Sequence, residues 1–285
     1  MKAEKIVEKI YKKYQSPMQI NRPEKLAISE AGEQCRRRLW LRFRWVIDIW
    51  EMVDGRMGRL FARGWKEEKW LSQDLTDIGF VVEQINPITK QPYFVSALEG
   101  HLKGVLDGII KDKKKTYIVE FKTHNDKSFA KLEKEGLEKS KPEHYVQCLL
   151  YAYLFSQQYY KVEKTLYVAV NKNNDELYCE WVDNNEKKAE QILSKLEYVK
   201  DTTLLPPNFY SQNSYNCKYC EYYEFCWSDK RIMISKNCRA CALSAPCHHG
   251  QWSCHLREKI VSPAYKICKD FDPILKEQKE EKNDK

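Results

Sequence analysis

The hydrophobic and polar positions of the chain alternate in blocks whose periods predict both helices and strands. Apolar residues at a helical period of three to four mark four segments: 3–15, about 28–46, 55–74 and 185–200. Short apolar or alternating runs between turn residues predict four strands: 80–84, 92–96, 166–171 and 176–182. Pro142 is expected near the start of a further helix, where its missing N–H costs little. This order predicts an α/β (α+β) chain with a mixed central sheet flanked by helices.

The most informative stretch consists of two apolar runs, 105–110 and 116–123, on either side of the polar segment 111–115. Apolar runs around a charged turn predict a β-hairpin. A symmetric hairpin centred near Lys113 puts Asp107 opposite Glu120, and directly opposed residues share a face of the sheet. Lys122 is two residues beyond Glu120 and shares that face. The pattern therefore predicts two acids and a lysine on one side of a small sheet.

This group of charges indicates a metal site. Two carboxylates so close together repel each other unless a cation lies between them. Mg²⁺ prefers carboxylate and water oxygens, and a bound Mg²⁺ can acidify a water and hold a phosphoryl oxygen. A neighbouring lysine can orient that water or stabilise charge on the phosphate. The alternative, commoner for this spacing alone, is a solvated strand face with an ordinary ion pair. The apolar surroundings of the acids, in LDGII and IVEFK, favour the metal site.

The helix after the hairpin adds Gln147 and Tyr151, which lie on one helical face at a spacing of four. Together these residues form D…ExK…QxxxY, a pattern that resembles the PD-(D/E)xK nuclease superfamily in its RecB-like branch. The upstream segment GWKEE fits the first motif of that branch, a glycine four residues before His or Glu, and supplies Glu68. The acid is typical of lambda-type phage exonucleases, whereas RecB-like members usually have His. Glu67 is the competing choice, and only one of the two acids is expected to face the metal.

The resemblance covers most of residues 30–230 and implies a restriction-endonuclease-like fold with metal-dependent DNA exonuclease activity. The implied ligands of one or two Mg²⁺ or Mn²⁺ ions are three carboxylates and one backbone carbonyl: Glu68, Asp107, Glu120 and Phe121. Lys122 would position or activate the water. His124 could carry a proton in place of the missing histidine, although a polar residue at a strand end is the simpler interpretation.

The resemblance also implies the partners of the enzyme. Gln147 and Tyr151 would hold the metal-site helix and touch the DNA backbone. The substrate would be single-stranded DNA or duplex ends, in phage or prophage recombination or repair, with a recombination protein as a further partner. Two other classes stay open: a non-catalytic nucleic-acid-binding module with an iron–sulfur or zinc site, and a zinc-dependent regulator.

The chain contains eleven cysteines, which is many for a chain without an apparent secretion signal. Metal binding is therefore expected rather than disulfides. Cys148 and Cys179 are expected to be small buried hydrophobes. A lone cysteine and a C-x2-C-x5-C triplet form another group: Cys35, Cys217, Cys220 and Cys226. This group resembles the iron–sulfur site of RecB-like nucleases of the AddAB and CRISPR-associated types, and implies a [4Fe–4S] cluster that joins the two ends of the nuclease domain. Zinc would satisfy the same thiols.

The last cysteines predict a second metal site, a zinc ion held by four thiolates: Cys238, Cys241, Cys254 and Cys268. A small segment with little core can gain its fold from the metal. Cys247 and the histidines near it are competing ligands, and scattered free cysteines are the simpler alternative. The region resembles a Cys-rich extension of phage and prophage RecB-like nucleases. The expected domains are a nuclease domain at 1–232, this extension at 233–272 and a charged tail at 273–285.

Composition changes this picture little. A net charge of +8, from 49 basic and 41 acidic residues, only weakly supports a polyanionic partner. The arginines crowded beside aromatics in 36–45 suit phosphate contact and base stacking, or form the solvated face of an amphipathic helix. No apolar run approaches the roughly 18 residues that a membrane span needs, so no membrane partner is expected. The charged N-terminus predicts no secretion signal, and the expected location is the cytoplasm.

Overall fold

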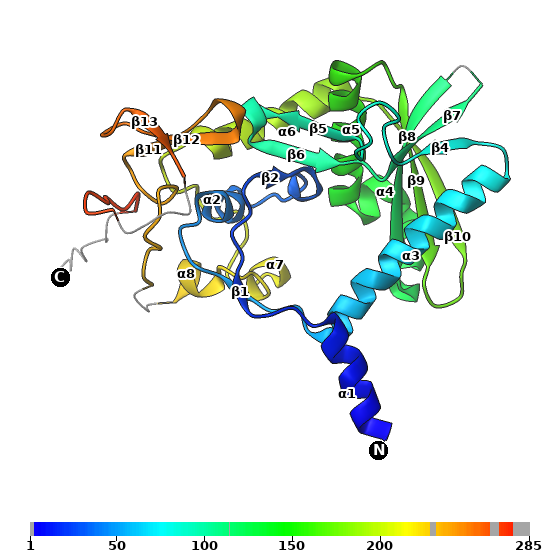
Figure 1. The fold of residues 1–285 in the computed structure, drawn as a ribbon, viewed down its shortest axis with the longest axis horizontal. Helices are drawn as coiled ribbons and strands as arrows, with labels where there is room; N and C mark the ends of the chain where they lie inside the picture. The colour runs from blue at the N-terminus through cyan, green and yellow to red at the C-terminus, as the bar shows by residue number, and fades with distance from the viewer. Residues whose placement is uncertain (1–2, 114, 229–231, 263–267, 276–285) are drawn as a thin grey trace.

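The computed structural model describes residues 3–113, 115–228, 232–262 and 268–275 (Figure 1). Its central sheet has five strands in the order β10-β9-β8-β7-β4, antiparallel except for the parallel pair β8–β9. The strands are β4 (Val81–Glu83), β7 (Gly108–Asp112), β8 (Lys115–His124), β9 (Lys164–Asn171) and β10 (Leu177–Asp183). Between β8 and β9 run α4 (Asp126–Ser140) and α5 (Pro142–Gln158), which form the crossover that a parallel pair needs. The predicted mixed sheet flanked by helices is confirmed.

Different helices cover the two faces of this sheet (Figure 1). On one face α3 (Gly55–Asp77) packs Leu71 and Leu75 against apolar side chains of β7, β8 and β9. On the other face, apolar side chains of α4 and α5 pack against β9 and β10. Phe121 belongs to the α3 side. Its neighbours Glu120 and Lys122 therefore emerge on the α5 side, because side chains alternate along a strand.

The central hairpin has the register that the sequence predicts. Gly108 pairs with Val119, and the ladder continues to the pair Asp112 and Lys115. Extending that register by one residue carries Asp107 opposite Glu120.

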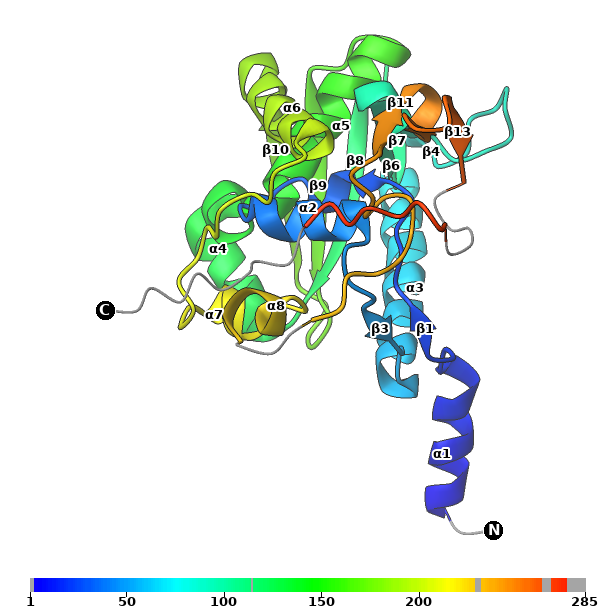
Figure 2. The same ribbon diagram turned by 90° about the vertical axis from the view of Figure 1, so that its left-hand side faces the viewer.

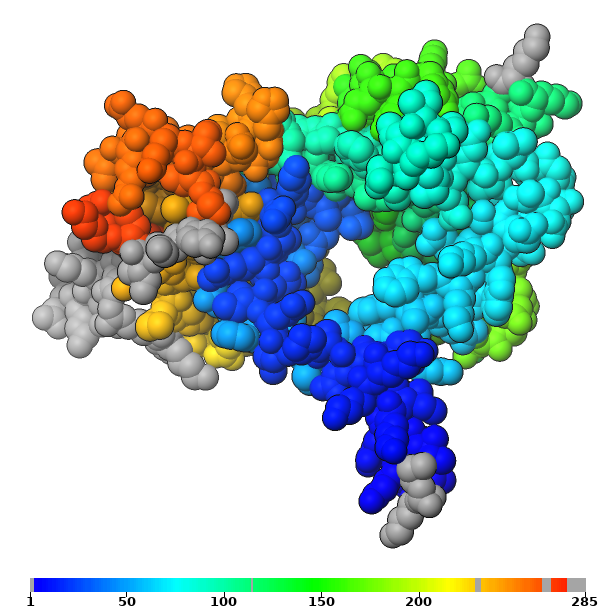
Figure 3. All heavy atoms as spheres, viewed as in Figure 1, coloured from blue at the N-terminus to red at the C-terminus, as the bar shows by residue number. Residues whose placement is uncertain are grey.

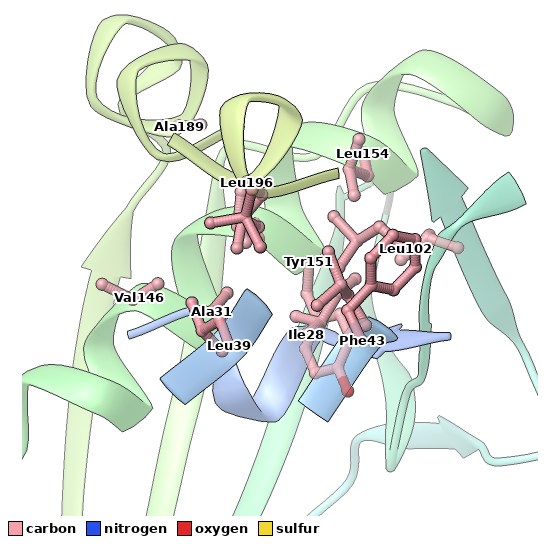
Figure 4. Packing of buried hydrophobic residues seen from close by; sticks show 14 of the residues in the cluster. Ile28, Ala31, Leu39, Phe43, Leu102, Val146, Tyr151, Leu154, Ala189 and Leu196 are labelled. Carbon is pink, nitrogen blue, oxygen red and sulfur yellow. The ribbon is translucent and has the colours of Figure 1, made fainter. Parts of the chain in front are cut away.

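A second, three-stranded sheet has the order β2-β6-β5 and is made of β2 (Leu26–Ala27), β6 (Leu102–Val105) and β5 (Phe94–Ala97). The main hydrophobic core lies between this sheet and the helices α2 (Arg36–Arg44), α5 and α6 (Glu186–Asp201) (Figure 4). Side chains labelled in Figure 4, such as Phe43 of α2, Leu102 of β6 and Leu196 of α6, are buried there.

The structure corrects two expectations about element boundaries. The apolar run 105–110 is not one strand, because Val105 ends β6 in the three-stranded sheet and β7 begins only at Gly108. The strand 92–96, expected from its place in the sequence to lead into the central hairpin, instead corresponds to β5 of the second sheet.

The expected helix at 28–46 is also shorter. A 3₁₀ turn, η1 (Ile28–Glu30), precedes α2. The backbone between them passes so close to α5 that a Cβ on Gly32 would lie 2.5 Å from the Cα of Glu143. The helix then ends at Trp45, which has a left-handed φ of 50°.

The first helix, α1 (Ala3–Tyr14), extends away from the body of the molecule (Figure 1 and Figure 2). None of its residues is buried. Its C-terminal end meets the start of α3, where Gly55 and Gly58 admit the backbone of Tyr11 and Tyr14. The short strands β1 (Gln19–Ile20) and β3 (Trp50–Glu51) pair beside this contact. Figure 3 shows an opening between this N-terminal segment and the body that carries α3.

The chain ends in the extension that carries the last cysteines. After the short helices α7 (Tyr215–Lys218) and α8 (Tyr223–Trp227), it forms a three-stranded sheet of β11 (Ser244–Cys247), β12 (Gln251–Cys254) and β13 (Lys259–Val261). Trp252 of β12 is fully buried and joins the main core beside Phe43. The expected tail 273–285 is described only to residue 275, and the rest lies outside the described residues. Among the described helices, none combines the length and apolar character of a membrane span.

Candidate active site

Asp107 stands at the junction between the two sheets, directly before β7. Its Oδ2 accepts a hydrogen bond of 2.8 Å from the backbone N–H of Phe121 on β8. This side-chain hydrogen bond extends the pairing of β7 and β8 beyond the last backbone pair, Gly108 and Val119. Burial raises the pKa of Asp107, while the Lys122 ammonium and the Phe121 N–H lower it.

Glu120 and Lys122 contact each other on the next strand, β8. The Lys122 ammonium binds Oε1 of Glu120, whose side chain is fully buried. The other oxygen, Oε2, is buried and has no hydrogen-bond partner among the described residues. Burial raises the pKa of Glu120 to about 8, and the carboxylates of Asp107 and Glu68 add to the shift that Lys122 opposes.

Glu68 of α3 completes the group, whereas Glu67 faces elsewhere. The Glu67 carboxylate is 5% exposed and lies 3.1 Å from Arg63 on the same helix. The Glu68 carboxylate instead accepts a hydrogen bond of 2.9 Å from the side-chain amide of Gln84. Burial raises the pKa of Glu68, and the nearby Asp107 raises it further. Three acids that are distant in the sequence, Glu68, Asp107 and Glu120, therefore lie close enough for their charges to interact with Lys122 or with one another.

Gln84 was not identified from the sequence. Its amide nitrogen donates to Glu68 and, at 3.3 Å, to the backbone carbonyl of Asp107, so it ties α3 to the hairpin. It directly follows β4, which pairs with β7. Only knowledge of that strand pairing could have placed this amide beside the acids.

Gln147 and Tyr151 meet on α5 as their spacing predicts. The Gln147 amide donates to the Tyr151 hydroxyl at 3.3 Å, and that hydroxyl donates to the carbonyl of Val105 at 2.8 Å. Both side chains are buried, and a Cβ on Gly104 would lie 2.6 Å from the Tyr151 ring. These contacts brace the end of β6 just before Asp107. Contact of either side chain with a DNA backbone stays a prediction.

His124 is held neutral in the core. Burial and the nearby lysines lower its pKa to about 4, and its ring nitrogens lie 2.8 Å from the Tyr167 hydroxyl and 3.0 Å from the Ser128 hydroxyl. This arrangement fits the polar residue at a strand end that the sequence also allowed.

The carboxylates have the chemistry of a divalent-cation site, although they are not gathered around one point. In the part of the chain that the structure describes, no three His, Cys, Asp or Glu side chains are arranged to hold one ion. Yet the buried, unpaired Oε2 of Glu120 and the raised pKa values of three neighbouring acids are what a hard cation would relieve. Binding of one ion by all three acids would require side-chain rotation. A role for the Phe121 carbonyl stays a prediction.

The first cysteine group lines one small cavity of about 20 Å³: Cys35, Cys217, Cys220 and Cys226. Residue 35 directly precedes α2, and the other three lie on or beside α7 and α8, so the cavity joins distant parts of the chain. The backbone N–H of Tyr222 points at the sulfur of Cys220 at 3.5 Å. Burial raises the pKa of Cys220 to about 11 and also raises that of Cys226.

The second group lines another cavity, of about 610 Å³: Cys238, Cys241, Cys254 and Cys268. Burial raises the pKa of Cys238, and the other three thiols add to the shift. Of the cysteines expected to be buried hydrophobes, Cys148 is buried and Cys179 is exposed on β10, so that expectation is wrong for Cys179. None of the eleven cysteines forms a disulfide.

The arginines of α2 are largely occupied by the protein itself. Arg38 contacts Glu33 and Glu221, at 2.6 and 3.2 Å. Arg44 is fully buried and donates to backbone carbonyls, and burial lowers its pKa to about 10. Arg38 is partly exposed, whereas Arg44 does not lie on the solvated helix face that the sequence allowed.

Comparison with known proteins gives one family. The model of the PD-(D/E)XK nuclease superfamily matches residues 5–227. No curated protein matches the chain.

Three solved structures share a modest likeness in fold. An alkaline exonuclease (LHK-Exo) from Laribacter hongkongensis has a TM-score of 0.44 and 14% identity, over 62% of this chain and 87% of that one. The protein SSO0001 has a TM-score of 0.41 and 18% identity, over 80% of this chain and 98% of that protein. LHK-Exo in complex with dAMP has a TM-score of 0.39 and 12% identity, over 62% of this chain and 86% of that protein.

Proposed function

Because the chain belongs to the PD-(D/E)XK nuclease superfamily, we propose that it is an exonuclease that hydrolyses phosphodiester bonds of DNA with Mg²⁺ or Mn²⁺. The observation that carries the proposal is the meeting of Glu68, Asp107 and Glu120 around Lys122, with one oxygen of Glu120 buried and unpaired. Such a group is costly for a folded protein unless a cation uses it. A divalent cation bound by these carboxylates would offset that cost.

In this proposal the three carboxylates would hold the metal, which would supply an acidified water and neutralise charge on the phosphate. Lys122, which contacts Glu120, would orient the water or stabilise charge on the phosphate. Gln84 keeps Glu68 against the hairpin, and Tyr151 keeps the preceding backbone in place. Each part of the site thus has a positioning contact within the protein.

We propose further that the first cysteine group holds a [4Fe–4S] cluster: Cys35, Cys217, Cys220 and Cys226. The position of all four thiols around one cavity and the N–H that points at a sulfur support a thiolate-bound cluster, and zinc is the alternative. The cavity, of about 20 Å³, would have to widen to admit the cluster. The cluster would tie α2 to α7 and α8. The free thiols fit a reducing compartment, and we propose the cytoplasm. We also propose a role in phage or prophage recombination or repair.

The test is cleavage of DNA labelled at the 5′ or 3′ end, single-stranded or duplex, with Mg²⁺. Asp107→Ala and Lys122→Ala are expected to lower the rate by roughly 10²-fold or more. Lys111→Ala is the matched control, because Lys111 lies on the same hairpin and pairs with Glu83. Cleavage at the wild-type rate by both site variants would refute the proposal and favour a non-catalytic module that binds nucleic acid.

A further inference from the structure

Two hairpins that are distant in the sequence meet tip to tip. One is β5–β6, joined by the 3₁₀ turn η2 (Leu98–Gly100), and the other is β11–β12, joined by η3 (His248–Gly250). Each turn ends in a left-handed glycine, Gly100 with φ 90° and Gly250 with φ 68°. A Cβ on Gly250 would lie 2.7 Å from the carbonyl oxygen of Gly100. The His101 ring nitrogen Nε2 is 2.8 Å from the carbonyl of Cys247.

Arg239 forms the second contact between the extension and the rest of the chain. It is 2% exposed, and its guanidinium lies 4.0 Å from the centre of the Trp45 ring. It donates to the carbonyls of Phe43, Pro23 and Glu24, at 3.0, 3.2 and 2.5 Å. A buried guanidinium is costly unless it is hydrogen-bonded, and these three carbonyls are its acceptors. The turn 238–241 therefore has to hold Arg239 in place against them.

Little within the extension itself holds that turn in place. Between residues 236 and 262 the buried apolar side chains that the structure describes are Ala240, Cys241 and Trp252. Two of them lie on or next to the CxxC turn, and the third points into the main core. A segment of this size with so little core usually needs a metal or a disulfide.

The cavity beneath this turn is lined by four cysteines and by cationic side chains. The cysteines are the CxxC pair, the last residue of β12 and one residue near the end: Cys238, Cys241, Cys254 and Cys268. The basic residues around them are Lys236, Arg257, Lys259 and Lys269. A guanidinium nitrogen of Arg257 lies 3.1 Å from the sulfur of Cys268. Asp270 also lines the cavity and pairs with Arg257 at 3.1 Å. Four thiolates around a divalent zinc carry two net negative charges, and the three lysines would offset them.

The competing ligands are directed elsewhere. Cys247 pairs in the β11–β12 ladder and is absent from the lining of the cavity, and so are the three nearby histidines. His248 faces Glu99 at 3.2 Å. The four cavity cysteines are therefore the donor set that remains in this region.

We propose that Cys238, Cys241, Cys254 and Cys268 bind one zinc ion, which fixes the extension against α2 and the β5–β6 hairpin. Soft thiolates favour zinc over the hard cations of the carboxylate site. The cavity is wider than one ion, so zinc would draw the CxxC turn and Cys268 together. Because β6 leads into Asp107, a seated extension also supports the backbone that delivers this acid.

The test measures zinc and iron per chain by mass spectrometry in the full-length protein, purified without added metal chelators. Cys238→Ser and Cys254→Ser are expected to lose about one equivalent of zinc while iron stays at the wild-type level. Cys247→Ser is the matched control, since it lies in the same small sheet but outside the cavity, and it should keep the zinc. Retained iron or retained circular dichroism shows that a zinc-free variant is still folded.

A second readout follows the seating of the extension. Addition of one equivalent of Zn²⁺ to metal-depleted protein should slow trypsin cleavage after residue 232, and should not do so in Cys238→Ser. Three results would overturn the proposal: no zinc in the wild type, equal zinc in all variants, or loss of iron instead of zinc from Cys238→Ser and Cys254→Ser.

Discussion

The buried carboxylate of Glu120 should destabilise the metal-free protein at neutral pH, so Glu120→Gln should stabilise it. The folded-state pKa of Glu120 is about 8, against 4.5 for the ordinary group. The folded protein therefore binds this proton more tightly than the unfolded chain. The contribution of this proton to the free energy of unfolding is fully present below pH 4.5, and it is lost as the pH rises from there through about 8.

The size of the effect follows from the pKa shift. At pH 7 the unfolded group is ionised, whereas the folded group is largely protonated. At about 1.4 kcal/mol per pKa unit, this difference lowers the free energy of unfolding at pH 7 by about 3 kcal/mol. The variant also removes the partner of the Lys122 ammonium, and that loss offsets part of the gain. We therefore expect Glu120→Gln to raise the free energy of unfolding by about 1–2 kcal/mol at pH 7.

Urea unfolding followed by tryptophan fluorescence, without added divalent ions, measures this difference. The advantage of the variant should grow from pH 5 to pH 8, and Mg²⁺ or Ca²⁺ should stabilise the wild type but not the variant. The same variant should be inactive on DNA. A variant that is less stable than the wild type at every pH, or that gains as much from Mg²⁺, would refute the reasoning.

Three further predictions concern other parts of the structure: the α3 acids, the contact between the two hairpin tips, and His124. Glu68→Gln should lower the rate of DNA cleavage by roughly 10²-fold, whereas Glu67→Gln should keep it, because only Glu68 reaches the acids; a larger loss in Glu67→Gln would reverse the assignment. Gly250→Ala should lower the free energy of unfolding by about 1–3 kcal/mol. Gly79→Ala should cost less, because both residues have positive φ but only Gly250 touches another backbone; equal thermal shifts would contradict the contact. His124→Gln should leave the pH–rate profile unchanged between pH 6 and 8, because burial already lowers the pKa of His124 to about 4; a lost inflection near pH 6.5 would show that it titrates there.

Local patterns predicted the parts of the site that depend on short-range geometry. The two apolar runs are placed symmetrically about the polar segment between them, so the register that sets Asp107 opposite Glu120 could be derived from these runs alone. The spacing of Gln147 and Tyr151 placed both on one face of α5 for the same reason.

Long-range packing decided the features that the sequence did not reveal. Gln84 reaches the acids only because β4 pairs with β7, and no local period encodes that pairing. Arg44 lies in a run that suggested phosphate contact, yet aromatic rings of α2 and β12 enclose its guanidinium. Its burial depends on a tryptophan more than two hundred residues away.

The close approach of Gly100 and Gly250 gives a rule for comparing related sequences. Positive φ alone tolerates Asn as well as Gly, but the 2.7 Å contact leaves no room for any side chain at position 250. Relatives that lack the Cys-rich extension should accept Asn at the position of Gly100, and relatives that carry it should keep both glycines. Glycine at position 100 is therefore expected to accompany the extension across the family, and other residues there should mark members that lack it.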